Sequence, residues 1–221
     1  MNYDKSYFGT RGGRASDIQL RDTAQSIVDN FHPSTVLDIG CGQAYLVHHL
    51  YQLGVEAYGV DISTYAISTA PADVSSHLLK IDLEVDNLPF VSGSMDLITA
   101  LNILEHVKNL DHVIEEMGRV LRVGGSVFMI SPLPITNSKL GQFLLGRGWH
   151  LLDTTHVNVH SRSFWEQIFA KHGFAYRGSF DLYSRAVPPI YWITKILVKL
   201  PLCAVFTSHV RGWYLFQKTK G

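Results

Sequence analysis

The sequence predicts an α/β fold in which a mostly parallel sheet lies between two layers of helices. Short apolar runs of strand length alternate with longer segments in which apolar residues recur at helical spacing. Glycines stand at the ends of several of these segments, and hydrophobic residues make up 46% of the 221 residues against 17% charged ones. This composition is typical of a packed globular protein, and the length favours a single domain, residues 1–221.

Each expected strand is an apolar run bounded by turn residues or by a helical pattern. The runs are Thr35–Ile39, Ala57–Val60, His77–Ile81, Asp96–Leu101, Val127–Ile130, Phe174–Asp181 and Gly212–Lys218. Helices are expected over Ser16–Phe31, Leu110–Leu121 and Ser161–Gly173, because their apolar residues share one face. We expect Gly124-Gly125 to end the second helix and to turn the chain into the next strand.

A glycine-rich turn follows the first expected strand, in Val36-Leu37-Asp38-Ile39-Gly40-Cys41-Gly42. Glycine has no Cβ and tolerates positive φ, so the backbone at this turn can approach a ligand closely. A dinucleotide-binding turn would have a third glycine where this chain has Tyr45, and it would not call for an acid at position 38. A dehydrogenase is therefore disfavoured.

This segment resembles the first motif of the class I S-adenosylmethionine-dependent methyltransferases. The resemblance implies a Rossmann-like three-layer sandwich, a seven-stranded sheet with an antiparallel final strand, and S-adenosylmethionine as the cofactor. It also implies that Asp38 steadies the turn and the ammonium end of the cofactor, while Gly40, Cys41 and Gly42 follow its methionine part. Ala44 stands where the family often has a further glycine, which makes left-handed backbone at that residue less favourable.

An acidic residue ends the next strand, in Gly59-Val60-Asp61-Ile62-Ser63. A carboxylate at this end of the strand can accept hydrogens from both hydroxyls of a ribose. We therefore expect Asp61 to bind the ribose of the cofactor, with Ile62 beside it. The alternative role, a helix N-cap, suits Ser63 better.

Two further segments complete the resemblance, which runs in the family's order from Val36 to Pro132. Asp82 and Leu83 resemble the residues that meet the adenine, although Asp82 is alternatively an ordinary turn aspartate. Leu101 and Asn102 belong to a segment that is similar to the family's fourth-strand signature, and both are expected at the cofactor.

His106 and His156 are the candidate catalytic residues, because both are expected near the carboxyl ends of strands and histidine accepts a proton near neutral pH. His106 resembles the histidine beside the cofactor in ubiquinone-pathway O-methyltransferases, where nearby carboxylates can also hold a divalent metal. Asn102 stands where that subgroup has an acid, so no metal is expected here. For each histidine the alternative is a structural hydrogen bond.

Residues 1–31 are expected to form an N-terminal lid and helix. Tyr3, Tyr7 and Phe8 resemble the aromatic lid that many small-molecule methyltransferases fold over the cofactor, and Tyr7 is included in the expected cofactor site. The alternative is a loosely tethered end that packs on the surface.

Residues 133–160 and 183–211 are expected to be insertions on the substrate side. Within the second, residues 188–207 are apolar, but Lys195, Lys199 and Pro201 argue against a membrane-spanning helix. We expect this segment to wall an apolar substrate pocket. A peripheral membrane contact and a homodimer interface are the alternatives.

The charge is zero overall but uneven, because no acidic residue follows Asp181 while six basic residues do. Nucleic acid is a disfavoured partner, since the body of the chain is acidic and no separate basic recognition module is evident. Two cysteines, Cys41 and Cys203, and a start without a secretory pattern favour the cytoplasm, with membrane association as an alternative.

We therefore expect an S-adenosylmethionine-dependent methyltransferase that acts on a small, hydrophobic metabolite, with methylation of oxygen favoured. The alternatives are N- or C-methylation of a natural product or lipid-linked substrate, and a non-catalytic partner protein that has kept the cofactor fold.

Overall fold

The computed structural model describes residue 8 and residues 14–134, 155–179 and 211–220. In this part of the chain, seven strands form one sheet in the order β3-β2-β1-β4-β5-β7-β6. The strands are β1 (Thr35–Ile39), β2 (Glu56–Asp61), β3 (Leu78–Lys80), β4 (Met95–Leu101), β5 (Leu121–Pro132), β6 (Phe174–Gly178) and β7 (Arg211–Lys218).

The directions of the strands confirm the predicted sheet. Neighbouring strands from β3 through β2, β1 and β4 to β5 are parallel, whereas β7 runs antiparallel to both β5 and β6. From β1 the chain builds outward to β2 and β3, and then returns to place β4 on the other side of β1. The carboxyl ends of β1 and β4 therefore flank the point where the strand order reverses, which is where open α/β sheets bind ligands.

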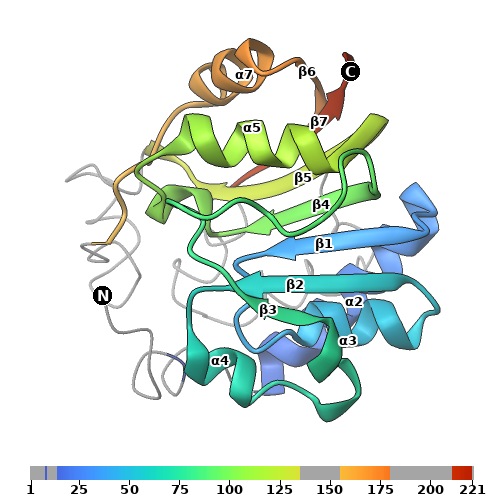
Figure 1. Ribbon diagram of the computed structural model, residues 1–221. Coiled ribbons are helices and arrows are strands. Elements are labelled where there is room, and N and C mark those ends of the chain that lie inside the picture. Colours follow the sequence, from blue (N-terminus) through green and yellow to red (C-terminus); the bar gives the residue numbers. More distant parts are fainter. Residues whose placement is uncertain (1–7, 9–13, 135–154, 180–210, 221) are drawn as a thin grey trace, which may run out of the picture.

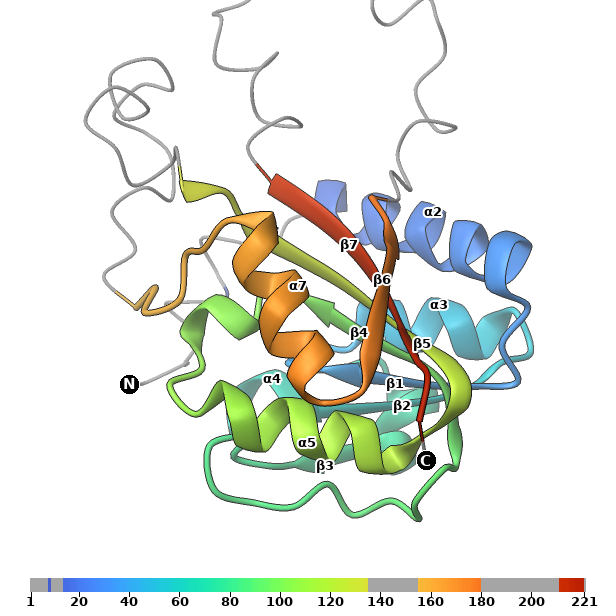
Figure 2. The same cartoon turned by 90° about the horizontal axis from the view of Figure 1, so that it is seen from above.

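Helices cover both faces of the sheet and give the predicted three layers (Figures 1 and 2). One face carries α2 (Arg14–Phe31) and α3 (Tyr45–Gln52), and the other carries α5 (Leu110–Val120) and α7 (Arg162–Lys171). The short helices are α4 (Thr64–Ser68), η1 (Ala72–His77) and η2 (Leu104–His106).

The two cores follow from the alternation of side chains along the buried strands. Ile98 of β4 packs into the core under α5 and α7, where Trp165 and Phe169 are fully buried. Its neighbour Leu97 faces the opposite core, which includes Ile27 of α2. A strand buried on both faces reads as continuously apolar, so the sequence pattern of β4 matches its position.

The expected role of Gly124-Gly125 is wrong. Helix α5 ends at Val120, and β5 begins at the next residue, so the two glycines lie inside the strand. The pairing of β5 with β4 is irregular between its first residue and Ser126, and Gly124 has φ +80°. A Cβ on Gly125 would lie 2.8 Å from the Asp96 carbonyl oxygen. The glycines therefore permit a bulge rather than a turn between elements.

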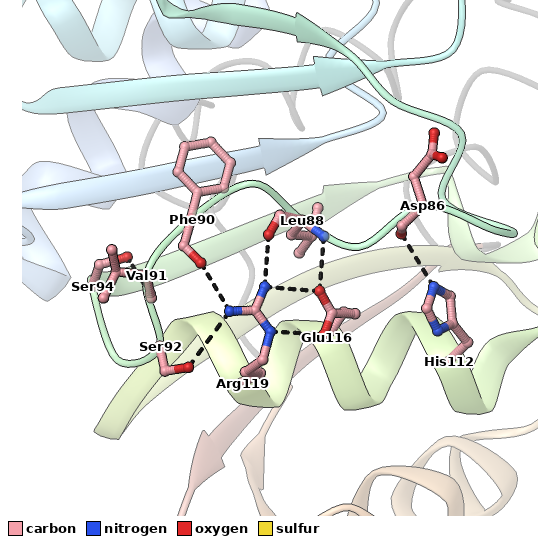
Figure 3. A network of polar contacts seen from close by, with 9 residues as sticks. All are labelled: Asp86, Leu88, Phe90, Val91, Ser92, Ser94, His112, Glu116 and Arg119. Atoms are coloured by element: carbon pink, nitrogen blue, oxygen red, sulfur yellow. Dashed lines mark hydrogen bonds and ion pairs between the residues drawn. The ribbon is translucent and has the colours of Figure 1, made fainter.

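Helix α5 also fastens the loop that connects β3 to β4 (Figure 3). Arg119 donates hydrogen bonds to the carbonyl oxygens of Leu88 (2.6 Å) and Phe90 (2.8 Å), and it pairs with Glu116. Glu116 in turn accepts a hydrogen bond from the Leu88 amide at 2.7 Å, and the bonds from Arg119 lower the pKa of its carboxyl. This clamp holds the loop against the helix.

Replacing Arg119 with lysine tests the clamp. One ammonium group cannot reproduce the planar set of donors, so we expect Arg119→Lys to lower the free energy of unfolding by about 2 kcal/mol. Urea unfolding measures the change. The control is Arg162→Lys, which affects an exposed pair with Glu166 and should cost less than about 1 kcal/mol. Equal effects of the two substitutions would show that the clamp contributes little.

Candidate functional site

The glycine-rich turn after β1 has the geometry expected of it. Gly40 has φ +70° and Gly42 has φ +54°, values that favour glycine. A Cβ on Gly40 would also lie 2.6 Å from the Ile103 side chain. Both the backbone conformation and the lack of space therefore favour glycine at this position. The amides of Gly40 and Cys41 both donate to the Val60 carbonyl oxygen, at 2.8 and 3.0 Å. The turn is therefore anchored to the end of β2.

Asp61 joins the turn to β2 through its side chain. One carboxylate oxygen accepts the Gly42 amide at 2.8 Å, and the other accepts the Ser63 amide at 2.8 Å. Burial raises the pKa of Asp61, and these backbone donors oppose that effect. Ser63, not Asp61, caps α4, since its hydroxyl accepts the Ala66 amide at 3.0 Å. The carboxylate thus stands at the turn, as the ribose assignment requires.

Asp38 is a buried acid, with 4% of its surface exposed, and it accepts a hydrogen bond from the Thr99 hydroxyl at 2.6 Å. Burial raises its pKa to about 7, the bond from Thr99 opposes this, and the charge of Asp61 adds to it. Burial also raises the pKa of the Cys41 thiol well above its ordinary value, so this group stays protonated. The Cys41 side chain occupies the space beside Gly59, where a Cβ would lie 2.8 Å from its sulfur.

Ala44 and Phe8 lie at the turn, where left-handed backbone and an aromatic lid were expected. Ala44 has φ 58°, the left-handed conformation that is less favourable for alanine than for glycine. Phe8 lies against the turn, since a Cβ on Gly42 would be 3.4 Å from its ring, and its centroid is 6.1 Å from that of Tyr65. Tyr7, the lid residue in the expected cofactor site, lies outside the described residues.

Asp82 has the turn role that was its alternative interpretation. Its carboxylate accepts the Glu84 amide at 3.0 Å, and its own amide donates to Asp86 at 2.9 Å. The neighbouring Ile81 amide donates to the Asp61 carbonyl oxygen at 3.0 Å. Asp82 therefore directly follows Ile81, whose amide is bonded to Asp61, the proposed ribose-binding residue.

The other expected cofactor residues lie at the same edge of the sheet. Ile62 directly follows β2 and is 42% exposed, while Leu83 packs partly buried against the core under α5. Leu101 ends β4, and Asn102 follows it with φ 55° and donates its amide to the Ile130 carbonyl oxygen. Asparagine tolerates this backbone conformation better than most residues.

The structure brings the two candidate catalytic histidines together. The ring centroids of His106 and His156 are 4.8 Å apart in an edge-to-face arrangement. The Thr155 hydroxyl lies 2.7 Å from Nδ1 of His106. The amides of Val157 and Asn158 donate to the Glu105 carbonyl oxygen at 2.8 and 3.0 Å, which ties the segment before α7 to the end of β4.

Sequence reasoning missed Thr99, Ile103 and Thr155. Thr99 is a polar residue inside an apolar strand, and in the sheet it pairs directly with Asp38. Its polarity was a usable signal, but the strand register was needed to interpret it. Nothing in the spacing of Ile103 or Thr155 indicated their contacts with Gly40 and His106.

Comparison with known proteins identifies the family. Residues 15–177 match the family described as a methyltransferase domain. The ubiquinone biosynthesis O-methyltransferase of Nitrosococcus oceani is 36% identical over 97 residues, 42% of this chain and 41% of that protein. The norajmaline N-methyltransferase of Rauvolfia serpentina is 30% identical over 131 residues, 54% of this chain and 45% of that protein. The chain spans about half the length of the curated relatives it matches.

Solved structures show the same fold at low sequence identity. Geranyl diphosphate C-methyltransferase from Streptomyces coelicolor superposes with a TM-score of 0.64 at 16% identity, over 99% of this chain and 87% of that one. A SAM-dependent methyltransferase from Archaeoglobus fulgidus gives 0.63 at 16% identity, over 96% and 97%. The chain belongs to the methyltransferase domain family, in its class I S-adenosylmethionine-dependent group.

No helix in the described part of the chain combines the length and apolar character that crossing a membrane requires. Residues 188–207, the expected pocket wall or membrane contact, lie outside that part.

The raised pKa of Asp38 gives a stability prediction with a definite sign. Its pKa in the folded state, about 7, lies above the ordinary 3.8, so its contribution is full below about pH 4 and is lost as the pH rises to about 7. Asp38→Asn removes this titration. The free energy of unfolding of the variant should therefore rise relative to the parent protein across this window, by up to about 4 kcal/mol.

Urea unfolding of both proteins at several pH values between 4 and 8 measures the difference. Asp73→Asn is the control, because Asp73 is a surface acid whose pKa is lowered by its hydrogen bonds with Gln52 and His48, so it titrates at lower pH than Asp38. If the free energies of unfolding of Asp38→Asn and the parent differ by the same amount at every pH, the raised pKa of Asp38 is contradicted.

Proposed function

We propose that the chain is an enzyme that transfers the methyl group of S-adenosylmethionine to an oxygen of a small, hydrophobic acceptor. The observation that carries this proposal is the Asp61 carboxylate, which is held by the Gly42 and Ser63 amides beside a turn with two positive-φ glycines. It lies at the carboxyl edge of the parallel strands, the usual ligand site of such sheets.

The residues at this edge fit the cofactor. The Asp61 carboxylate accepts the Gly42, Ser63 and Ile62 amides, and a carboxylate oxygen can accept more than one hydrogen, so this group can also receive ribose hydroxyls. Asp38 supplies a buried acid for the ammonium end, since a nearby cation favours its ionised form. The full proposed set is Tyr7, Asp38, Gly40, Cys41, Gly42, Asp61, Ile62, Asp82, Leu83, Leu101 and Asn102. When bound, the cofactor supplies a methyl group on a sulfonium centre.

His106 and His156 form the proposed acceptor side of the site. A lone pair of the acceptor hydroxyl forms the new bond to the methyl carbon, and the hydroxyl proton must leave. An imidazole within hydrogen-bond reach can take it, and Thr155 fixes the orientation of the His106 ring. The similarity to ubiquinone biosynthesis O-methyltransferases supports oxygen as the methylated atom.

The hydrophobic character of the acceptor is inferred from the apolar segment 188–207, which we propose as a pocket wall within the substrate-side insertions 133–160 and 183–211. If the acceptor is a lipid, the same segment would also contact the membrane surface from the cytoplasmic side. If the purified chain does not sediment with anionic liposomes, the proposal of a membrane contact is refuted.

Loss of the Asp61 carboxylate tests the cofactor site. We expect Asp61→Ala to weaken S-adenosylmethionine binding by about 100-fold, because two charge-assisted bonds to the ribose are lost and the turn loses its anchor. Isothermal titration calorimetry measures the dissociation constant. Asp73→Ala, which removes a surface carboxylate bonded to His48 and Gln52, is the control and should bind as the parent does. An unchanged constant in Asp61→Ala would refute the ribose assignment.

Turnover with a panel of hydrophobic phenols tests the catalytic assignment. We expect His156→Ala to lower kcat by about 100-fold or more and to leave cofactor affinity within threefold of the parent. His160→Ala is the matched control, because His160 lies on the same segment but contacts Phe164 and Asn158. If the parent binds S-adenosylmethionine but yields no methylated product from the panel, a non-catalytic partner protein becomes the better account.

A further inference from the structure

We propose that Thr99 is a positioning residue for the cofactor, whose hydroxyl holds the Asp38 carboxylate in the orientation and charge state that receive the ammonium group. The hydroxyl donates to Asp38 at 2.6 Å, and both side chains are buried. The inference deepens the proposed function and rests on it, because it names the residue that makes the same site selective for nucleosides with an amino-acid ammonium group.

The register of the sheet places the two side chains next to each other. Asp38 and Thr99 are paired residues of the parallel strands β1 and β4. Their neighbours Leu37 and Ile98 pack in the core under α5 and α7, so Asp38 and Thr99 point to the opposite face, which α2 and α3 cover. The contact is therefore set by two buried strands and not by a loop.

The residues on either side of this pair offer no competing partner. On β2, Asp38 is paired with Gly59, which has no side chain, and the Cys41 sulfur fills the space beside that glycine. On β5, Thr99 is paired with Phe128, which is fully buried and cannot form a hydrogen bond through its side chain. Among the residues that the structure describes, Thr99 is therefore the one side-chain donor to Asp38.

The ionisable groups around Asp38 supply no positive charge to it within the described ranges. Asp61, at the end of β2, adds a negative charge, and the Cys41 thiol in the turn stays protonated. The helices that cover this face carry Asp17 and His49, which bond each other at 2.8 Å. A buried carboxylate without a positive neighbour is costly, so the ammonium group of the cofactor would stabilise its ionised form.

The Thr99 hydroxyl controls how readily Asp38 ionises. Burial raises the pKa of Asp38 to about 7, and the bond from Thr99 opposes this effect. A hydroxyl that donates to a carboxylate favours its charged form, and such bonds are typically about 2.5–2.7 Å long. The bond engages Oδ1 of Asp38, which leaves Oδ2 for the ammonium group. Without this donor, the carboxylate would be protonated more often near neutral pH and would bind an ammonium group less tightly.

Calorimetry with two nucleosides tests this role without reference to activity. S-adenosylhomocysteine carries the ammonium group, whereas methylthioadenosine has the same adenosine and thioether but no amino-acid part. Thr99→Val keeps the shape of the side chain and removes the hydroxyl, so it should weaken S-adenosylhomocysteine binding by at least about tenfold at about pH 6. Methylthioadenosine should bind within about threefold of the parent, because it has no group that pairs with Asp38.

The pH supplies a second readout with a definite sign. The loss of S-adenosylhomocysteine affinity should be smaller at about pH 8 than at about pH 6, because a higher pH ionises Asp38 even without the hydroxyl. Thr99→Ser keeps the hydroxyl and should bind within about threefold of the parent. A purely structural role of Thr99 would weaken both nucleosides alike and by the same factor at both pH values.

A double variant tests whether Thr99 acts through Asp38. In an Asp38→Asn background, Thr99→Val should change S-adenosylhomocysteine binding by no more than about twofold, because the carboxylate that it serves is gone. Thr35→Val is the matched control, since it removes a hydroxyl that donates to the Ser94 carbonyl oxygen at 3.0 Å, at the other end of β1 from the turn. Thermal unfolding checks each variant, and Thr99→Ala takes the place of Thr99→Val if that variant does not fold.

The inference is overturned if Thr99→Val binds S-adenosylhomocysteine as tightly as Thr35→Val does, or if it weakens both nucleosides by the same factor. The parent chain separates these outcomes from a failure of the proposed function. Tight binding of S-adenosylhomocysteine by the parent, with no effect of Thr99→Val, refutes only the role of Thr99. A parent chain that binds neither nucleoside refutes the cofactor site itself, and the inference with it.

Discussion

The hydrogen bond from the Gly42 amide to the Asp61 carboxylate is the interaction on which the site depends. It joins the turn after β1 to the end of β2, and the Val60 carbonyl oxygen strengthens the same connection by accepting the amides of Gly40 and Cys41. A buried carboxylate is costly unless donors surround it. Here the donors are backbone amides. The carboxylate is stabilised only when the turn has this geometry, and the carboxylate in turn holds the turn in place.

This junction also sets the position of the histidine pair. The Ile103 side chain packs where a Cβ on Gly40 would lie, and η2, with Glu105 and His106, follows directly. The segment of His156 is in turn bonded to the Glu105 carbonyl oxygen. A continuous chain of contacts thus runs from the ribose candidate to the proposed acceptor side, so the distance between them is fixed by the end of β4 rather than by a separate loop.

The sequence predicted what depends on local chemistry, and it failed where pairing between distant segments decides the outcome. Buried strands and positive-φ glycines have local signals, so the strand β1 and the backbone geometry of the turn at Gly40 and Gly42 were confirmed. The turn role of Asp82 and the capping role of Ser63 were foreseen as alternatives. The bulge at Gly124-Gly125 depends on how β5 meets β4, and the contact of Thr99 with Asp38 depends on register. Both histidines were expected near the carboxyl ends of the strands, but the direct contact of their rings depends on how the chain returns after β5, and no spacing encodes that path.

A crystal structure with S-adenosylhomocysteine tests the central claim most directly. Both ribose hydroxyls should lie within about 3 Å of the Asp61 carboxylate oxygens, with the amino-acid part extended along Gly40–Gly42. A nucleoside bound elsewhere on the sheet, or a ribose without contact to Asp61, would contradict it.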